Sequence, residues 1–126
     1  MHNKKVSNLL SMSGDARNLY FVRKVADFEI VWSLFEDGWA MVADDNEQKA
    51  IPFWPEKELA ELCAKGEWRN YHSKQIKLDD FLLKWLPGMI KDGLSVAIFP
   101  TPSDKGVILS PTKLLSLLED EVKQYE

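Results

Sequence analysis

The sequence predicts an α+β fold in which one mostly antiparallel sheet of about five strands is flanked by four to five helices. Short runs of β-branched and aromatic residues, bounded by turn residues, predict the strands. Longer segments whose apolar residues recur every three or four positions predict the helices. The chain has no internal repeat and no long linker, so residues 1–126 are expected to form a single domain.

Capping residues and prolines mark the ends of the predicted helices. Ser13 and Ser110 are suited to N-cap positions, and Pro55 and Pro111 to first helical positions. Pro87 removes a backbone donor inside the fourth helix, which is therefore expected to kink, or to break and restart. The expected helices cover residues 6–12, 13–26, 55–66, 79–93 and 110–125.

Tight turns separate the predicted strands. The pair Asp37-Gly38 supplies the positive φ that a hairpin needs, which predicts pairing between the strands on either side of it. Pro52 cannot donate a ladder hydrogen bond, so its strand is expected at an edge or leaving the sheet. The expected strands cover residues 30–35, 39–43, 49–54, 94–99 and 107–109, with a possible short strand near 75–78.

Composition places the chain among ordinary globular proteins. Apolar residues make up 45% and charged residues 29% of the 126 positions, which excludes disordered and low-complexity classes. The net charge of −4 gives no overall attraction to nucleic acid or anionic lipid. No apolar run approaches the roughly 18 residues needed to cross a membrane. A single cysteine and the lack of an apolar signal-peptide core predict a cytoplasmic protein without intramolecular disulfides.

The sequence offers no set of ligands for a metal or a cofactor. One cysteine and two widely separated histidines cannot make a zinc or iron site. The acidic run 44–47 is expected to be a solvated turn, because Lys49 and Pro55 stand where a calcium loop needs glycine and glutamate. The glycines form no phosphate-binding motif. We therefore expect neither a metal nor a cofactor.

Two residues could form a catalytic pair. Cys63 is a candidate nucleophile and His72 a candidate base, with Asp79 or Asp80 available to orient the imidazole. Against this, Cys63 falls on the apolar side of a predicted helix, where buried thiols are usually inert.

Tryptophan is unusually frequent, with five in the chain. Trp32 and Trp85 lie on strongly apolar segments and are expected in the core. Three others stand at element ends beside turn or charged residues, where an aromatic ring can line a groove. The candidate binding residues are these three and their polar neighbours: Trp39, Trp54, Trp68, Arg69, Tyr71 and His72.

Several segments together resemble a known bacterial family. They are residues 20–27 (YFVRKVAD), 37–40 (DGWA), 51–55 (IPFWP), 60–63 (AELC), 78–81 (LDDF), 85–88 (WLPG), 99–102 (FPTP) and 106–111 (GVILSP). This pattern resembles the family called domain of unknown function 2750 over nearly the whole chain. The resemblance implies no activity and no catalytic residues. The order of elements is also similar to the amino-terminal domain of the enhanced serine sensitivity protein SseB and to immunity-type domains.

These observations favour a non-catalytic domain that binds a protein or a small ligand through an aromatic groove. One alternative is an immunity-like antagonist whose acidic surface meets a basic toxin. Another is an enzyme that uses Cys63 and His72, and a third is a purely structural subunit. The chain is expected to be a monomer or a homodimer, with no nucleic acid or membrane as partner.

Overall fold

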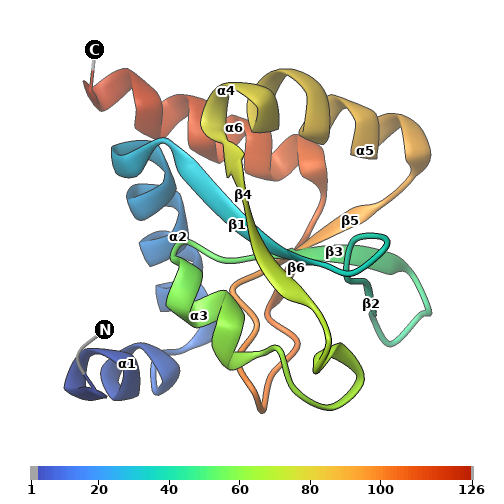
Figure 1. Cartoon of the computed structure of the whole chain (residues 1–126). Coiled ribbons are helices and arrows are strands. Elements are labelled where there is room, and N and C mark those ends of the chain that lie inside the picture. Colours follow the sequence, from blue (N-terminus) through green and yellow to red (C-terminus); the bar gives the residue numbers. More distant parts are fainter. Residues whose placement is uncertain (1–2, 126) are drawn as a thin grey trace.

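The structure is a computed structural model of the chain, and it describes residues 3–125 (Figure 1). It has the predicted α+β class. The helices are α1 (Asn3–Leu10), α2 (Gly14–Phe28), α3 (Lys57–Leu62), α4 (Leu78–Asp80), α5 (Leu86–Asp92) and α6 (Pro111–Val122). The strands are β1 (Ile30–Phe35), β2 (Val42–Ala43), β3 (Lys49–Phe53), β4 (His72–Lys77), β5 (Ser95–Ile98) and β6 (Val107–Leu109). Short helical turns cover Gly66–Trp68, Phe81–Trp85 and Lys123–Tyr125.

The strands form two sheets, where the sequence predicted one. β1 pairs antiparallel with β4, and the other sheet has the order β2-β3-β5-β6 with β3 and β5 parallel. The turn at Asp37 and Gly38 forms, but Trp39 makes only a single bridge to Phe35 before the chain leaves to pair with β3. The partner of β1 is β4 instead, in a region where the sequence indicated only a short strand.

The two sheets meet at β3. Trp32 and Trp54 exchange backbone hydrogen bonds of 2.9 and 2.8 Å, and Ser33 Oγ donates to the carbonyl oxygen of Pro52 at 2.7 Å. The carbonyl of Phe53 accepts a hydrogen bond from Phe99 N and so faces β5. Backbone groups of successive strand residues point to alternate sides, so the backbone nitrogen and carbonyl of Pro52 face away from β5. There the β2 ladder has ended and β1 approaches. Pro52 therefore stands in a strand with neighbours on both sides without leaving a ladder donor missing.

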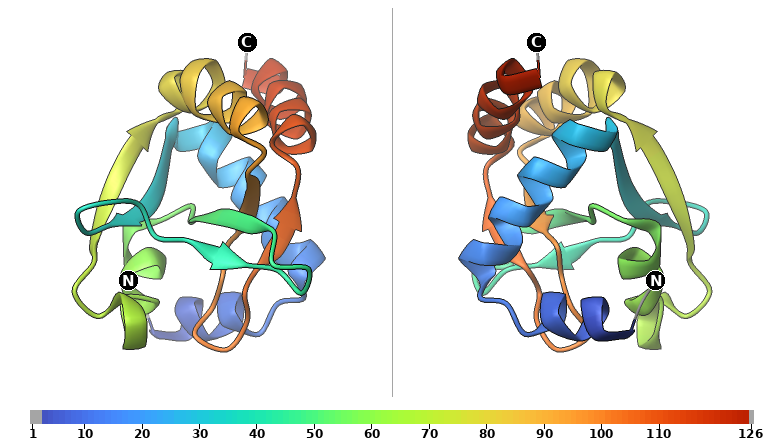
Figure 2. Two further views of the ribbon diagram at one scale, coloured as in Figure 1. Left: turned by 90° about the vertical axis from the view of Figure 1, so that its right-hand side faces the viewer. Right: turned by 90° about the vertical axis from the view of Figure 1, so that its left-hand side faces the viewer.

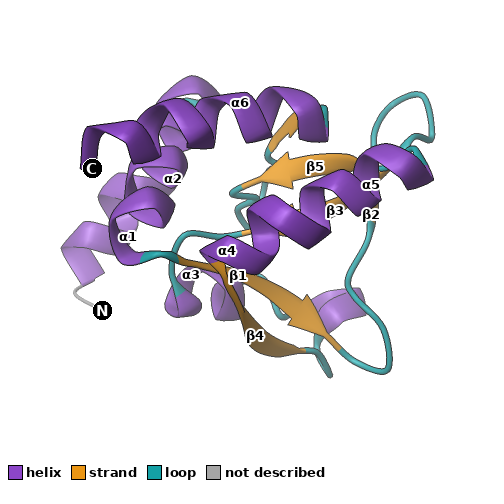
Figure 3. Ribbon diagram, turned by 90° about the horizontal axis from the view of Figure 1, so that it is seen from above, coloured by secondary structure: helices purple, strands orange, loops and turns teal. Residues whose placement is uncertain are grey.

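Helices lie on both sides of the sheets. Seen from above, α5 and α6 run next to each other over the strands, whereas α1 and α3 lie on the opposite side (Figures 1 and 3). Aromatic rings join the upper helices to the sheet, because Phe53 packs edge-on against Phe81 at 4.8 Å and against Trp85 at 5.9 Å between ring centroids. None of the helices between residues 3 and 125 is long and apolar enough to cross a membrane.

The caps predicted from sequence are present. Ser13 Oγ accepts from Ala16 N at 3.2 Å, and Ser110 Oγ accepts from Lys113 N at 3.1 Å. The prediction of Pro55 at a first helical position is wrong, because the third helix begins at Lys57 with Glu56 as its N-cap and Pro55 precedes that cap. The helix continues through Pro87, because a π-helical turn precedes it and Leu86 N donates to the carbonyl of Phe81.

Candidate functional site

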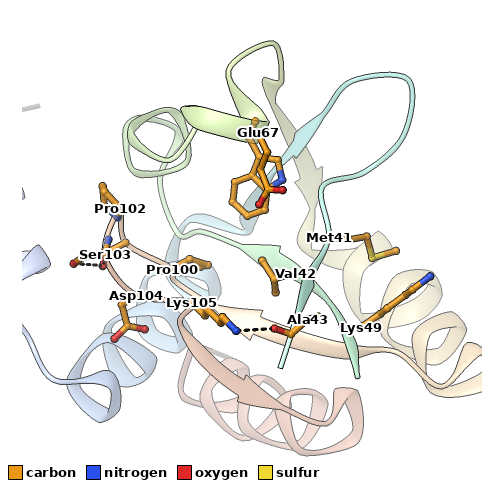
Figure 4. Close-up of a pocket in the computed structure, with 12 residues that line it drawn as sticks. Met41, Val42, Ala43, Lys49, Glu67, Pro100, Pro102, Ser103, Asp104 and Lys105 are labelled. Atoms are coloured by element: carbon orange, nitrogen blue, oxygen red, sulfur yellow. Dashed lines mark hydrogen bonds between the residues drawn. The ribbon is translucent and has the colours of Figure 1, made fainter. Parts of the chain in front are cut away.

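A groove of about 730 Å³ opens beside the turn that follows β5 (Figure 4). Four parts of the chain line it: the edge strand β2 with the preceding Met41, Lys49 at the start of β3, the helical turn Gly66–Trp68 and the turn at residues 100–105. In the left view of Figure 2 this last turn, in orange, descends on the side away from α5 and α6. Loops at the carboxyl ends of parallel strands are common ligand sites, and β3 and β5 are the parallel pair of this sheet.

The turn at residues 99–106 has a strained and tightly defined backbone. Phe99 is fully buried and has a φ of 51°, in the left-handed region that non-glycine residues rarely adopt. Thr101 and Asp104 exchange backbone hydrogen bonds of 2.9 and 3.2 Å. Asp104 Oδ1 also accepts from Gly106 N at 2.7 Å. A strained backbone that persists must be held by its surroundings.

Buried side chains hold this turn from beneath. Trp54 Nε1 donates to the carbonyl of Pro100 at 2.8 Å, and Cys63 Sγ lies 3.4 Å from the same oxygen. Arg17, only 4% exposed, donates from Nε to the carbonyl of Phe99 at 3.2 Å. Buried polar groups are kept only where they are paired, so these contacts fix the wall of the groove before any ligand arrives.

Arg17 also ties the turn to the first two helices. Its Nη1 donates to the carbonyl of Met12 at 2.7 Å, and its Nη2 lies 3.3 Å from Asp104 Oδ2. One guanidinium therefore connects the α1–α2 junction, the end of β5 and the rim of the groove. The planar, multiply donating guanidinium suits this role.

Trp68 is the predicted binding residue that lines the groove. Its ring is half-buried and packs edge-on against Trp54, with centroids 6.3 Å apart and planes at 89°. Trp54, which was also expected to line a groove, does not line this one, because its side chain is 0% exposed. Its indole N–H has the Pro100 carbonyl as a partner, so nothing requires it to face solvent. Trp54 supports the wall that Trp68 and Pro100 form.

Trp39 lies in a different aromatic cluster. Its ring packs edge-on against Phe35 at 5.0 Å and against Trp85 at 4.6 Å, measured between ring centroids. Lys74 Nζ stands 5.6 Å from the centre of the Trp39 ring. Trp39 does not line the groove of Trp68. Trp85 and Trp32, both expected in the core, are half-buried and pack against it.

Arg69, Tyr71 and His72 continue the chain away from the groove and do not line it. Arg69 is exposed, and its Nη1 donates to the carbonyl of Gly66 at 3.0 Å. Tyr71 is half-buried and packs against the core. His72 is the exposed first residue of β4, and its Nε2 lies 3.5 Å from a carboxylate oxygen of Glu36.

The structure does not bring Cys63 and His72 together as a pair. Cys63 is buried, 7% exposed, and its hydrogen-bond partner is the Pro100 carbonyl, whereas His72 faces Glu36 on the β1 side. Burial raises the pKa of the Cys63 thiol from 9.0 to about 11, against smaller opposing effects of Trp54 and Lys65. The protonated thiol is the form that the fold favours.

The raised pKa of Cys63 predicts slow alkylation. Iodoacetamide at pH 8 is expected to label the native thiol at least about a hundredfold more slowly than the urea-unfolded chain, because two pKa units mean about a hundredfold less thiolate. The free energy of unfolding should also fall as pH rises from 9 toward about 11, since the unfolded thiol ionises first. Labelling rates measured by mass spectrometry, with Cys63→Ala as a blank, test the predicted slow alkylation. Equal rates in the native and unfolded chain would contradict it.

The rim of the groove carries charges of both signs. Lys49 and Lys105 stand near β2, and Glu67 and Asp104 are the acidic lining residues. Lys105 Nζ donates to the carbonyl of Ala43 at 3.1 Å (Figure 4). The same Nζ lies 4.0 Å from Asp45 Oδ1. Sequence reasoning did not identify the turn at 100–105 as part of a site. Its position could have indicated a site, since a Pro-Thr-Pro run directly follows a strongly apolar strand.

Among residues 3–125, no group of three or more His, Cys, Asp and Glu side chains is arranged to hold a metal ion. A family model described as "Protein of unknown function (DUF2750)" matches residues 19–118, which include β2, Trp68 and the turn at 100–105. Comparison with curated proteins and with solved structures found no match. The likeness to the SseB amino-terminal domain and to immunity-type domains is therefore not shown.

Proposed function

The chain belongs to the DUF2750 family, and we propose that it is a binding domain that holds an extended polypeptide segment in the Trp68 groove. The observation that carries this proposal is the convergence of Arg17, Trp54 and Cys63 on the carbonyls of Phe99 and Pro100. Three buried donors maintain a strained turn that forms the groove wall. A wall fixed in advance lowers the entropic penalty of binding.

The chemistry of the lining suits a peptide with apolar side chains. Trp68, Pro100 and Pro102 give the groove an aromatic and proline-rich wall, and its volume of about 730 Å³ accommodates several side chains. Tryptophan is the residue type most enriched among energetically dominant binding contacts. Charges of both signs at the rim can set the direction and register of a bound segment.

The edge strand β2 favours an extended polypeptide over a compact small molecule. It is the outer strand of its sheet, and both its residue Ala43 and the preceding Met41 are exposed. Asp44 N donates to the carbonyl of Gln48, so antiparallel alternation turns the backbone groups of Ala43 away from β3. These groups can pair with an added strand. Lys105, which now donates to Ala43, protects this edge as lysine commonly does.

Selection of peptides tests the proposal. A phage-displayed random peptide library panned on the wild-type chain should yield a consensus with alternating apolar residues. A synthetic peptide of that consensus should bind Trp68→Ala about tenfold more weakly than wild type, because the variant lacks the central aromatic wall. Titration calorimetry gives the dissociation constants.

A matched control separates the groove from general surface effects. Leu83→Ala removes an apolar side chain away from the groove, 76% exposed in the π-helical turn, and should bind the peptide as wild type does. Circular dichroism should show both variants folded. Failure to enrich any sequence, or equal affinity of the Trp68→Ala variant, would overturn the proposal.

A further inference from the structure

The outer face of α2 carries a symmetric pattern of charge. Asp15, Leu19 and Arg23 follow one another at intervals of four residues, so they lie in one row along the helix. All three are exposed, and the leucine side chain is 49% exposed. The right view of Figure 2 shows α2 crossing this side of the molecule with nothing in front of it. An acidic residue, an apolar residue and a basic residue thus occupy equal steps on an open surface.

Leu19 stands between two hollows of opposite charge. The hollow of about 360 Å³ contains Arg23 and Lys24, with Tyr125 at its side and Asp27 as its acidic member. The hollow of about 420 Å³ lies between α2 and α6, and its charged residues are all acidic: Asp15, Asp120 and Glu121. Leu19 lines both of them. The acidic half and the basic half therefore meet at one exposed leucine.

Asp15 and Arg23 form no ion pair within the described part of the chain, 3–125. Their separation of eight residues, about two helical turns, is too long for them to pair with each other. Lys24 instead lies over the rings of Phe28, at 4.3 Å, and Tyr20, at 5.9 Å. Both Asp15 and Arg23 are thus available to a partner.

We propose that this face of α2 binds the same face of a second copy of the chain. A two-fold axis at Leu19 would place the two α2 helices antiparallel and bring Asp15 of each copy opposite Arg23 of the other. A two-fold interface uses one patch twice, so the patch must complement itself. A row with opposite charges four residues on either side of an apolar centre meets this requirement. Exposed Tyr125, which lines the basic hollow beside Leu19, would extend the apolar contact.

Charge reversal tests the pairing directly. Sedimentation equilibrium of the wild-type chain should show a concentration-dependent monomer–dimer equilibrium that weakens as salt is raised. Asp15→Arg and Arg23→Asp should each weaken dimerisation about tenfold, because each reversal places like charges at two symmetric contacts. The double variant restores opposite charges across the axis and should recover most of the wild-type affinity.

Two further variants keep the test sharp. Leu19→Glu should abolish the dimer, because it places two carboxylates at the axis. Leu83→Glu changes a more exposed leucine elsewhere, 76% against 49% for Leu19, and should leave the dimer intact. Circular dichroism should confirm that α2 folds in every variant, since Asp15 also favours the start of this helix. A wild-type chain that stays monomeric, or a double variant no better than the single reversals, would overturn the proposal.

Discussion

Replacing Trp54 with alanine is expected to lower the free energy of unfolding by about 4 kcal/mol, the range found for deleting a fully buried large aromatic ring. The side chain is 0% exposed and lies where the two sheets join, since its backbone exchanges hydrogen bonds with Trp32. The substitution removes the ring beneath Trp68 and also the Nε1 donor to the Pro100 carbonyl. Urea denaturation followed by circular dichroism measures the change.

Two related variants separate packing from hydrogen bonding. Trp54→Phe keeps most of the ring and removes the donor, so it should destabilise by about 1.5 kcal/mol. Trp68→Ala truncates the half-buried neighbour and should lower stability by no more than about 2 kcal/mol. If Trp54→Ala destabilised the chain no more than Trp68→Ala, the supporting role assigned to Trp54 would be wrong.

Local structure could be predicted well from this sequence because its signals are local. Ser13 and Ser110 cap their helices as predicted, since an N-cap depends on a hydroxyl and an amide three residues apart. The strands at 95–98 and 107–109 also lie within predicted segments. Gly93 ends α5 in the left-handed conformation that glycine adopts without strain. The DUF2750 family was also identified from the sequence and is confirmed.

Strand partners could not be predicted, because pairing depends on residues far apart in sequence. The hairpin signal at Asp37 and Gly38 correctly predicts a turn, but it cannot show that the next strand pairs with β3. Likewise, polar residues in β4 gave little strand signal, and its register with β1 is fixed by tertiary pairing. The single expected sheet is therefore two sheets joined at Trp32 and Trp54.

The candidate site was predictable only as a set of aromatic residues. Sequence position made Trp54 and Trp68 equivalent candidates, since both stand at element ends beside turn or charged residues. Their difference arises from long-range contacts, because Trp54 pairs through its backbone with Trp32 and donates from Nε1 to the carbonyl of Pro100, 46 residues away. Trp54 is fully buried, whereas Trp68 is half-buried at the groove.

Gly106→Ala is expected to destabilise the chain by about 3 kcal/mol, because the new Cβ would clash with neighbouring backbone atoms and the positive φ would be strained for alanine. A Cβ atom at this position would lie 2.5 Å from the carbonyl oxygen of Ile98 and 3.0 Å from Pro100 N. The residue also has a φ of 89°, which alanine tolerates poorly. The clash involves backbone, so relief requires movement of the turn that Arg17 and Trp54 hold in place.

Two other glycines in the chain allow the steric clash and the backbone strain to be measured separately. Gly66→Ala introduces strain without a clash, since φ is 58° and a Cβ would meet nothing within 4 Å, so it should destabilise by about 1 kcal/mol. Gly88→Ala, at an open helical position, should be neutral or stabilise by up to about 1 kcal/mol. Urea denaturation of the three variants should show the largest loss of stability for Gly106→Ala, a clearly smaller loss for Gly66→Ala and the smallest for Gly88→Ala. A Gly106 variant no less stable than the Gly66 variant would show that the turn beside the groove is free to move, which would contradict a wall formed in advance.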